Sequence, residues 1–170
     1  MRGATKLQAL TPATVDQAFA LAREANSALS LEEWRRFAEP RSSEMPSQIR
    51  SPGVLLVTRD DTIRGIAAVE QTVSRAGERV LCANRVVVMD RVRRDRVAHE
   101  MLRGLFGIAQ RDGCTRMRAS LPQSSGWLLK YWADPEGTIL RIPVDCTLVT
   151  ETEFCDPPMD NVIHVQFPAR

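Results

Sequence analysis

The sequence predicts one α+β domain, residues 1–170, with a mostly antiparallel sheet of six to seven strands and about four flanking helices. Two observations lead to this prediction. Apolar and β-branched segments recur between turn signals, and stretches of helical periodicity lie before, between and after them. A chain of 170 residues has the length of one domain and can bury a substantial core. Its 44% hydrophobic and 26% charged residues are typical of a globular protein.

The first elements are a short strand over residues 6–10 and two helices. Thr11-Pro12 can start the first helix, with a capping hydroxyl and a proline at the first helical position. Its predicted buried face consists of apolar residues spaced by three and four: Val15, Ala18, Phe19, Ala22 and Ala25. Ser30 and Glu33 form a capping box that predicts the start of the second helix.

Three strands follow a loop over residues 39–52, which contains three prolines. Residues 53–58 and 63–73 flank the turn Asp60-Asp61 and predict an antiparallel hairpin. A second turn leads to a strand over residues 80–89, which completes a meander.

The helix after this strand has the clearest pattern in the chain. Its predicted buried stripe consists of Val97, Ala98, Met101, Leu102, Leu105, Ile108 and Ala109. Asp112-Gly113 supplies a C-terminal glycine, and a strand resumes over residues 114–121, which makes residues 80–121 a βαβ-like unit. A short helix over residues 127–133 and strands over 144–150 and 162–167 complete the predicted order.

Arginines are concentrated where the strand over residues 80–89 gives way to the helix. Four lie within six positions: Arg91, Arg93, Arg94 and Arg96. Cations at a helix N-terminus are disfavoured by roughly 0.3–1 kcal/mol each. The amides of a helix's first turn lack intrahelical partners and bind anions such as phosphate. The cluster therefore predicts a local anion site.

The rest of the composition argues against several classes of protein. A net charge of +2 is too small for nucleic-acid or membrane binding by bulk electrostatics. The four cysteines form no CxxC pair and the two histidines lie far apart, so no metal site is predicted. Cys82 and Cys114 are expected to be small buried thiols. No apolar leader or membrane-length apolar run is present, which favours a cytoplasmic protein.

The order of elements resembles that of the GNAT superfamily of acyl-CoA-dependent N-acetyltransferases. The family's signature at the start of its central helix, R/Q-x-x-G-x-G/A, aligns with residues 93–98. Arg93 and Ala98 fit its first and last positions, whereas Arg96 stands at the middle glycine, so the motif is degenerate. The positions of Val88 and of Tyr131 also match equivalents in the family.

The resemblance implies a site for acetyl-CoA. Its pyrophosphate would lie on the backbone amides of Arg93, Arg94, Asp95, Arg96, Val97 and Ala98. If the strand splays from its neighbour at residues 115–121, the backbone of Val86, Val87 and Val88 would be free to bind the pantetheine amides and the thioester carbonyl.

The resemblance also implies catalytic residues. Tyr131 would protonate the departing thiolate, and the alternative is a half-buried helix tyrosine. Relatives often carry a catalytic glutamate where this chain has Asn84 and Arg85, neither of which can accept a proton. Glu70 on the preceding strand would act through a water, and the alternative is a solvated strand glutamate.

Three functions remain open at this point. The first is an N-acetyltransferase that moves an acetyl group from acetyl-CoA to a primary amine of a small molecule or protein by direct attack. The second is a catalytically weak or inactive domain of the same fold, acting as a cofactor sensor or a protein-interaction module. The third, nucleic-acid binding, is poorly supported because few aromatic residues accompany the arginines. The strand over residues 162–167 could also pair with a second copy, so a homodimer is an alternative to a monomer.

Overall fold

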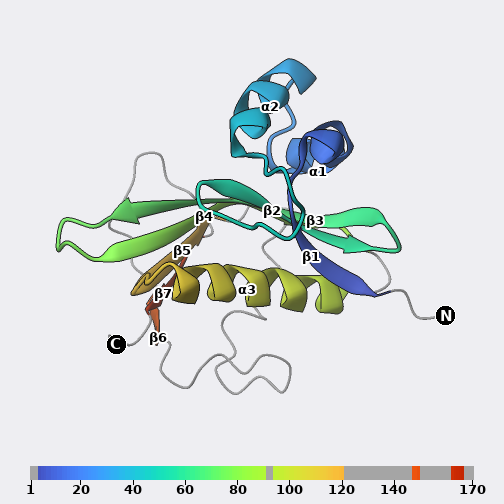
Figure 1. The fold of residues 1–170 in the computed structure, drawn as a ribbon. Helices are drawn as coiled ribbons and strands as arrows, with labels where there is room; N and C mark the ends of the chain where they lie inside the picture. The colour runs from blue at the N-terminus through green and yellow to red at the C-terminus, as the bar shows by residue number, and fades with distance from the viewer. Residues whose placement is uncertain (1–3, 91–93, 121–146, 150–161, 167–170) are drawn as a thin grey trace.

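The computed structural model describes residues 4–90, 94–120, 147–149 and 162–166. Its elements are β1 (Thr5–Ala9), η1 (Pro12–Thr14), α1 (Val15–Ala25), α2 (Leu31–Ala38), η2 (Glu39–Arg41), β2 (Gly53–Arg59), β3 (Thr62–Val73), β4 (Arg79–Val88), α3 (Arg94–Arg111), β5 (Arg116–Ser120), β6 (Thr147–Val149) and β7 (Val162–Gln166). The helices α1 and α2 lie on one side of the sheet and α3 lies on the other (Figure 1). This arrangement confirms the predicted α+β class. The predicted helix over residues 127–133 lies outside the described residues.

The strands form one seven-stranded sheet in the order β1-β2-β3-β4-β5-β7-β6. Strands β1 to β4 pair antiparallel, as the predicted hairpin and meander require. The β4–β5 pair is parallel, because α3 carries the chain across the sheet between them. Strand β7 pairs antiparallel with β5 and with β6.

The helices α1 and α2 cover their face of the sheet with a separate apolar cluster. The capping box predicted for α2 is present, since the Glu33 amide donates to Ser30 Oγ at 3.2 Å and the Ser30 amide donates to Glu33 Oε2 at 2.8 Å. Trp34 is fully buried, and its Nε1 donates to the carbonyl of Val15 at 2.7 Å. This bond joins α2 to the start of α1. The first helix opens with a 3-10 turn, which the sequence did not predict.

The helix α3 packs across the other face. Every residue of its predicted apolar stripe is buried: Val97, Ala98, Met101, Leu102, Leu105, Ile108 and Ala109. The helix ends at Arg111 and is followed by the predicted glycine, Gly113, where φ is +68° and beyond which the Cys114 amide donates to the Ala109 carbonyl at 2.8 Å. Cys114 is buried as expected, but Cys82 is only half-buried, and its Sγ lies 3.6 Å from the hydroxyl of the exposed Thr72.

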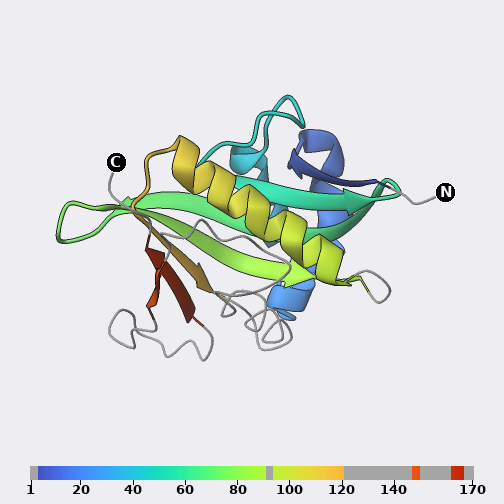
Figure 2. The ribbon, with the colours of Figure 1, turned by 90° about the horizontal axis from the view of Figure 1, so that it is seen from below.

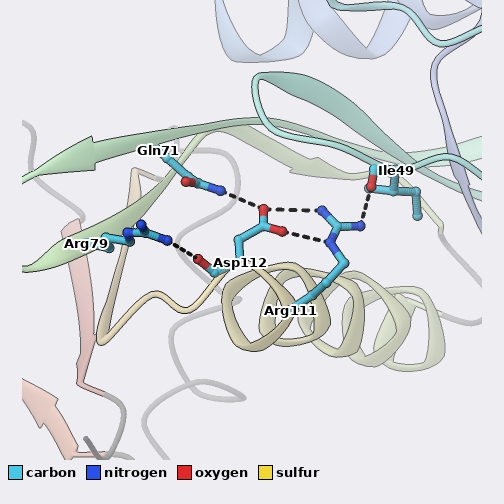
Figure 3. Close-up of polar contacts among 5 residues, drawn as sticks. All are labelled: Ile49, Gln71, Arg79, Arg111 and Asp112. Atoms are coloured by element: carbon cyan, nitrogen blue, oxygen red, sulfur yellow. Dashed lines mark hydrogen bonds and ion pairs between the residues drawn. The ribbon is translucent and has the colours of Figure 1, made fainter. Parts of the chain in front are cut away.

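A polar network fixes the C-terminal end of α3 (Figure 3). Arg111 Nε donates to Asp112 Oδ1 at 2.7 Å, and Gln71 of β3 donates to Asp112 Oδ2 at 2.6 Å. Arg111 also donates to the carbonyl of Ile49. The network joins the loop before β2, the strand β3 and the end of α3, so the helix is held at this end independently of its apolar stripe.

The part of the chain that the structure describes contains no helix long and apolar enough to cross a membrane.

Candidate functional site

Strands β4 and β5 pair over only part of their length. The parallel ladder runs from Val80 opposite Arg116 to Ala83 opposite Ala119. Beyond Ala83, residues 84–88 have no partner in the described part of β5, and the two strands diverge (Figure 2). The described parts of the two strands diverge as the family resemblance leads one to expect, and the residues that follow Ser120 lie outside the described residues. We call residues 84–88 the released edge, because their backbone groups on the β5 side are not used by that ladder.

The released edge begins with a β-bulge. Ile66 lies opposite Val87 and Ala68 lies opposite Asn84, so both Arg85 and Val86 lie opposite Ala67. Arg85 has φ +55°, in the left-handed region. A non-glycine residue there costs of order 1–3 kcal/mol, and such strain is concentrated at functional sites. The bulge also re-aims the backbone at the point where β4 leaves β5.

The side chains of the released edge face in different directions. Val86 and Val88 are buried in the apolar cluster under α3, whereas Val87 is buried in the cluster under α1 and α2. None of the three side chains is available to a ligand. These residues could therefore contribute to a ligand site only through the backbone, and the site that the family resemblance implies stays a prediction.

Arg85 reaches the side of α1 and α2. Its guanidinium carbon lies 4.6 Å from the centroid of the Phe37 ring on α2, and that of Arg41 lies 4.2 Å from the same centroid. Burial lowers the pKa of Arg85, and the positive charge of Arg41 lowers it further. From the sequence, Arg85 was of interest only because it lies where relatives often carry a catalytic glutamate. The contact of Arg41 and Arg85 with Phe37 was not predicted, because no local sequence pattern shows that these three residues come together.

The N-terminus of α3 follows β4 closely. Helix α3 begins at Arg94, with Asp95 and Arg96 exposed and Val97 and Ala98 buried against the sheet. Of the residues predicted to bind pyrophosphate, Arg93 lies outside the described residues. The exposed Arg96 side chain points away from the core, so the residue at the family's glycine position leaves the packing of α3 undisturbed.

The two residues predicted to be catalytic have different outcomes. Glu70 is half-buried on β3, opposite Cys82. Its neighbour Val69 packs in the cluster under α3, so the alternation of a strand directs Glu70 to the side that Arg85 occupies. Tyr131 lies outside the described residues, so its catalytic role stays a prediction.

Known structures share this architecture, whereas the sequence matches no protein-family model and no curated protein. An aminoglycoside N-acetyltransferase in complex with CoA superposes with a TM-score of 0.64 at 11% identity, covering 78% of this chain and 87% of that one. An acetyltransferase of Trypanosoma brucei gives 0.57 at 18% identity, covering 77% and 92%. A GCN5-related N-acetyltransferase of Kribbella flavida gives 0.54 at 18%, covering 76% of this chain and 32% of that one. The chain has the GNAT fold, the fold of the GCN5-related N-acetyltransferases.

Proposed function

We propose that this protein is an N-acetyltransferase that moves an acetyl group from acetyl-CoA to a primary amine of a small molecule or protein. The observation that carries the proposal is the released edge of β4, which ends next to the N-terminus of α3. The neighbours of the same fold include an acetyltransferase in complex with CoA, which supports the choice of cosubstrate.

The residues at this end of the sheet fit coenzyme A. The first four amides of α3, over residues 94–97, have no partners within the helix and would bind the pyrophosphate. The Arg96 guanidinium is exposed and can approach a phosphate, as would Arg93 and Arg94. The backbone of Val86, Val87 and Val88 would bind the pantetheine amides through the groups that the described part of β5 leaves unpaired.

The chemistry needs few side chains. Acetyl-CoA, when bound, supplies a thioester acyl group. The amine nitrogen attacks its carbonyl carbon directly, so a C–N bond forms, the C–S bond breaks and the thiolate takes up a proton. A backbone amide of the released edge would donate to the carbonyl oxygen as negative charge develops, a contribution of about 3–4 kcal/mol for a well-placed donor. Glu70 would accept the proton of the ammonium group through a water, and Tyr131 would protonate the thiolate.

Calorimetric titration of acetyl-CoA and coenzyme A tests the cosubstrate. The wild-type protein is expected to bind both, and Arg93→Ala and Arg96→Ala are each expected to weaken binding about tenfold, the loss of one charge-assisted contact to phosphate. Arg36→Ala is the matched control, because Arg36 is an exposed arginine of α2 that pairs with Glu32. Absence of binding to the wild-type protein at millimolar cofactor would contradict the proposal.

A second candidate function is that of a catalytically inactive domain of the same fold, which senses the cofactor or docks on a protein. It is favoured by Arg85, a cation at a position where relatives often carry a base. Binding of coenzyme A with no acetylation across a broad panel of amines would support it. A measured acetylation rate that collapses in Tyr131→Phe would exclude it.

A further inference from the structure

We infer that the amine acceptor also carries a carboxylate or phosphate group, which Arg85 and Arg41 bind beside Phe37. The inference rests on the proposed function and names the substrate class of the same site. We call Arg41, Arg85 and Phe37 the arginine pair site. Its three residues come from η2, the bulge of β4 and α2.

The arginine pair site concentrates positive charge that the described residues do not neutralise. Both guanidinium groups contact one phenylalanine ring, at 4.2 Å and 4.6 Å from its centroid. Within the described part of the chain, neither arginine forms a salt bridge to a carboxylate. Two like charges held together without a counterion are unfavourable, so the arrangement favours binding of an anion.

Part of the hydrogen-bonding capacity of the pair is also unused within the described part of the chain. Arg41 Nη1 donates to the carbonyl of Phe37 at 3.0 Å. Arg85 Nη1 is buried and has no hydrogen-bond acceptor among the described residues. A buried donor without an acceptor costs about 1–3 kcal/mol. The planar guanidinium of arginine fits the paired oxygens of a carboxylate or phosphate, which would supply that acceptor.

The phenylalanine that carries the two arginines is held in place. Its ring lies 5.9 Å from the ring of Trp34, which is fully buried between α1 and α2. The backbone at Arg85 is held as well, since the bulge keeps this residue at positive φ. A rigid pair of guanidiniums loses less conformational entropy on binding than two free surface side chains would.

An anion bound by the arginine pair site would lie near the residues proposed to take part in acetyl transfer. Arg85 directly precedes Val86, so the guanidinium is attached next to the first residue of the strand segment whose backbone would bind the thioester. Glu70 lies on the same side of the sheet. An ammonium group alone would be repelled by two arginines, whereas a molecule with both charges can place its anion on the pair and its amine toward Glu70.

The experiment compares matched acceptors. A homologous series of ω-amino acids and phosphoethanolamine is tested, each beside its neutral amide or alcohol. Calorimetry first measures coenzyme A binding, and then binding of each amine to the CoA-saturated protein. Initial acetylation rates with acetyl-CoA follow.

The variants are Arg85→Gln, Arg85→Lys and Arg41→Gln, with a check of folding by circular dichroism. Arg23→Gln is the matched control, because Arg23 also lies over a phenylalanine, Phe19, but is exposed. Among the described residues, no second arginine lies over the Phe19 ring.

The expected result is a preference of at least about tenfold for an acid-bearing amine over its neutral counterpart, both in affinity and in kcat/KM. Arg41→Gln and Arg85→Gln should abolish the preference, Arg85→Lys should retain part of it, and Arg23→Gln should leave it unchanged. The ratio between carboxylates and phosphoethanolamine identifies the preferred anion. Coenzyme A affinity should be the same in all four variants.

Two failures are distinguishable. If coenzyme A binds and every neutral amine binds as well as its acid-bearing counterpart, the arginine pair site is overturned and the proposed function stands. If coenzyme A does not bind, the proposed function fails. Equal binding of neutral and acidic amines to the protein without cofactor would then overturn the anion site as well.

Discussion

Arg59 and Asp90 form a buried ion pair at the end of β4, with Arg59 Nη1 2.5 Å from Asp90 Oδ2. The Asp90 side chain is 2% exposed and that of Arg59 is 15% exposed. Arg59 is the last residue of β2, and Asp90 lies between the last residue of β4 and the start of α3. The pair therefore ties the segment that leads into the proposed pyrophosphate site to the sheet.

Removal of one partner should be strongly destabilising. Asp90→Asn is expected to lower the free energy of unfolding by roughly 3–5 kcal/mol, because it leaves a mostly buried guanidinium without its closest counterion. Urea unfolding measures the change. Asp60→Asn is the control, since Asp60 contacts the same arginine at 3.6 Å but is 62% exposed. A loss below about 0.5 kcal/mol is expected there. Equal effects of the two substitutions would show that the buried pair is not what holds this segment.

The network at the end of α3 should make stability depend on pH in the acid range. Hydrogen bonding and charge from Arg111, with a further bond from Gln71, lower the pKa of Asp112 below its ordinary value of 3.8. Because the folded pKa is depressed, this carboxylate stabilises the protein above its unfolded pKa. The stabilisation is lost as the pH falls through the folded pKa.

The variant Asp112→Asn isolates this contribution. It is expected to be less stable than the wild type near neutral pH, and the two should converge at acid pH, below the folded pKa of the wild-type carboxyl. Urea unfolding across the acid range gives the comparison. The pKa of Asp16 is also lowered, by Arg35, but that pair is exposed, so salt should reduce the effect of Asp16→Asn more than that of Asp112→Asn. A constant difference between Asp112→Asn and wild type at all pH values would contradict the assignment.

The turn between β2 and β3 offers a stabilising substitution. Arg59 pairs with Thr62, so Asp60 and Asp61 form a two-residue hairpin loop, and both have positive φ, 51° and 57°. This is the geometry of a type I′ turn, in which glycine is preferred at the second position. Asp61→Gly should raise the free energy of unfolding by about 0.5–1 kcal/mol. Gly77→Ala, at φ +80° in the next hairpin, should change it in the opposite direction by a similar amount. Destabilisation by Asp61→Gly would mean that the carboxylate contributes more than the strained backbone costs.

The fold could be predicted where periodicity reports burial. The stripe from Val97 to Ala109 was predicted because apolar side chains at helical spacing share one face, and Gly113 was predicted because the end of a helix favours a residue that adopts positive φ. The turn at Asp60-Asp61 was predicted as a turn, but two aspartates do not indicate its I′ geometry.

The site could be predicted only in part. A family motif located the N-terminus of α3, and the splay of β4 from β5 followed from the same resemblance. The bulge at Arg85 could not be predicted, because an arginine at positive φ follows from the surrounding sheet and not from its own preference. The contact of Arg85 with Phe37 and Arg41 depends on that bulge and on the packing of α2, neither of which has a local signal.

The strain at Arg85 leads to the last prediction. Arg85→Ala and Arg85→Gly both remove the guanidinium and its contact with Phe37, so the difference between them reports the backbone alone. At φ +55°, glycine should be more stable than alanine by about 1–2 kcal/mol, the cost of the left-handed conformation for a residue with a Cβ. Urea unfolding of the two variants measures this difference.

The same two variants separate stability from function. If the bulge serves to position the Arg85 guanidinium, Arg85→Gly should be at least as stable as Arg85→Ala. Both variants should nevertheless show the same loss of preference for acid-bearing amines. Gly77→Ala is the control, because Gly77 lies in the hairpin between β3 and β4, away from the released edge, so this substitution should change stability and leave that preference intact. Equal stability of Arg85→Gly and Arg85→Ala would show that the backbone relaxes when the guanidinium is removed. In that case the contact of the Arg85 side chain with Phe37, and not the sheet, holds the bulge at positive φ.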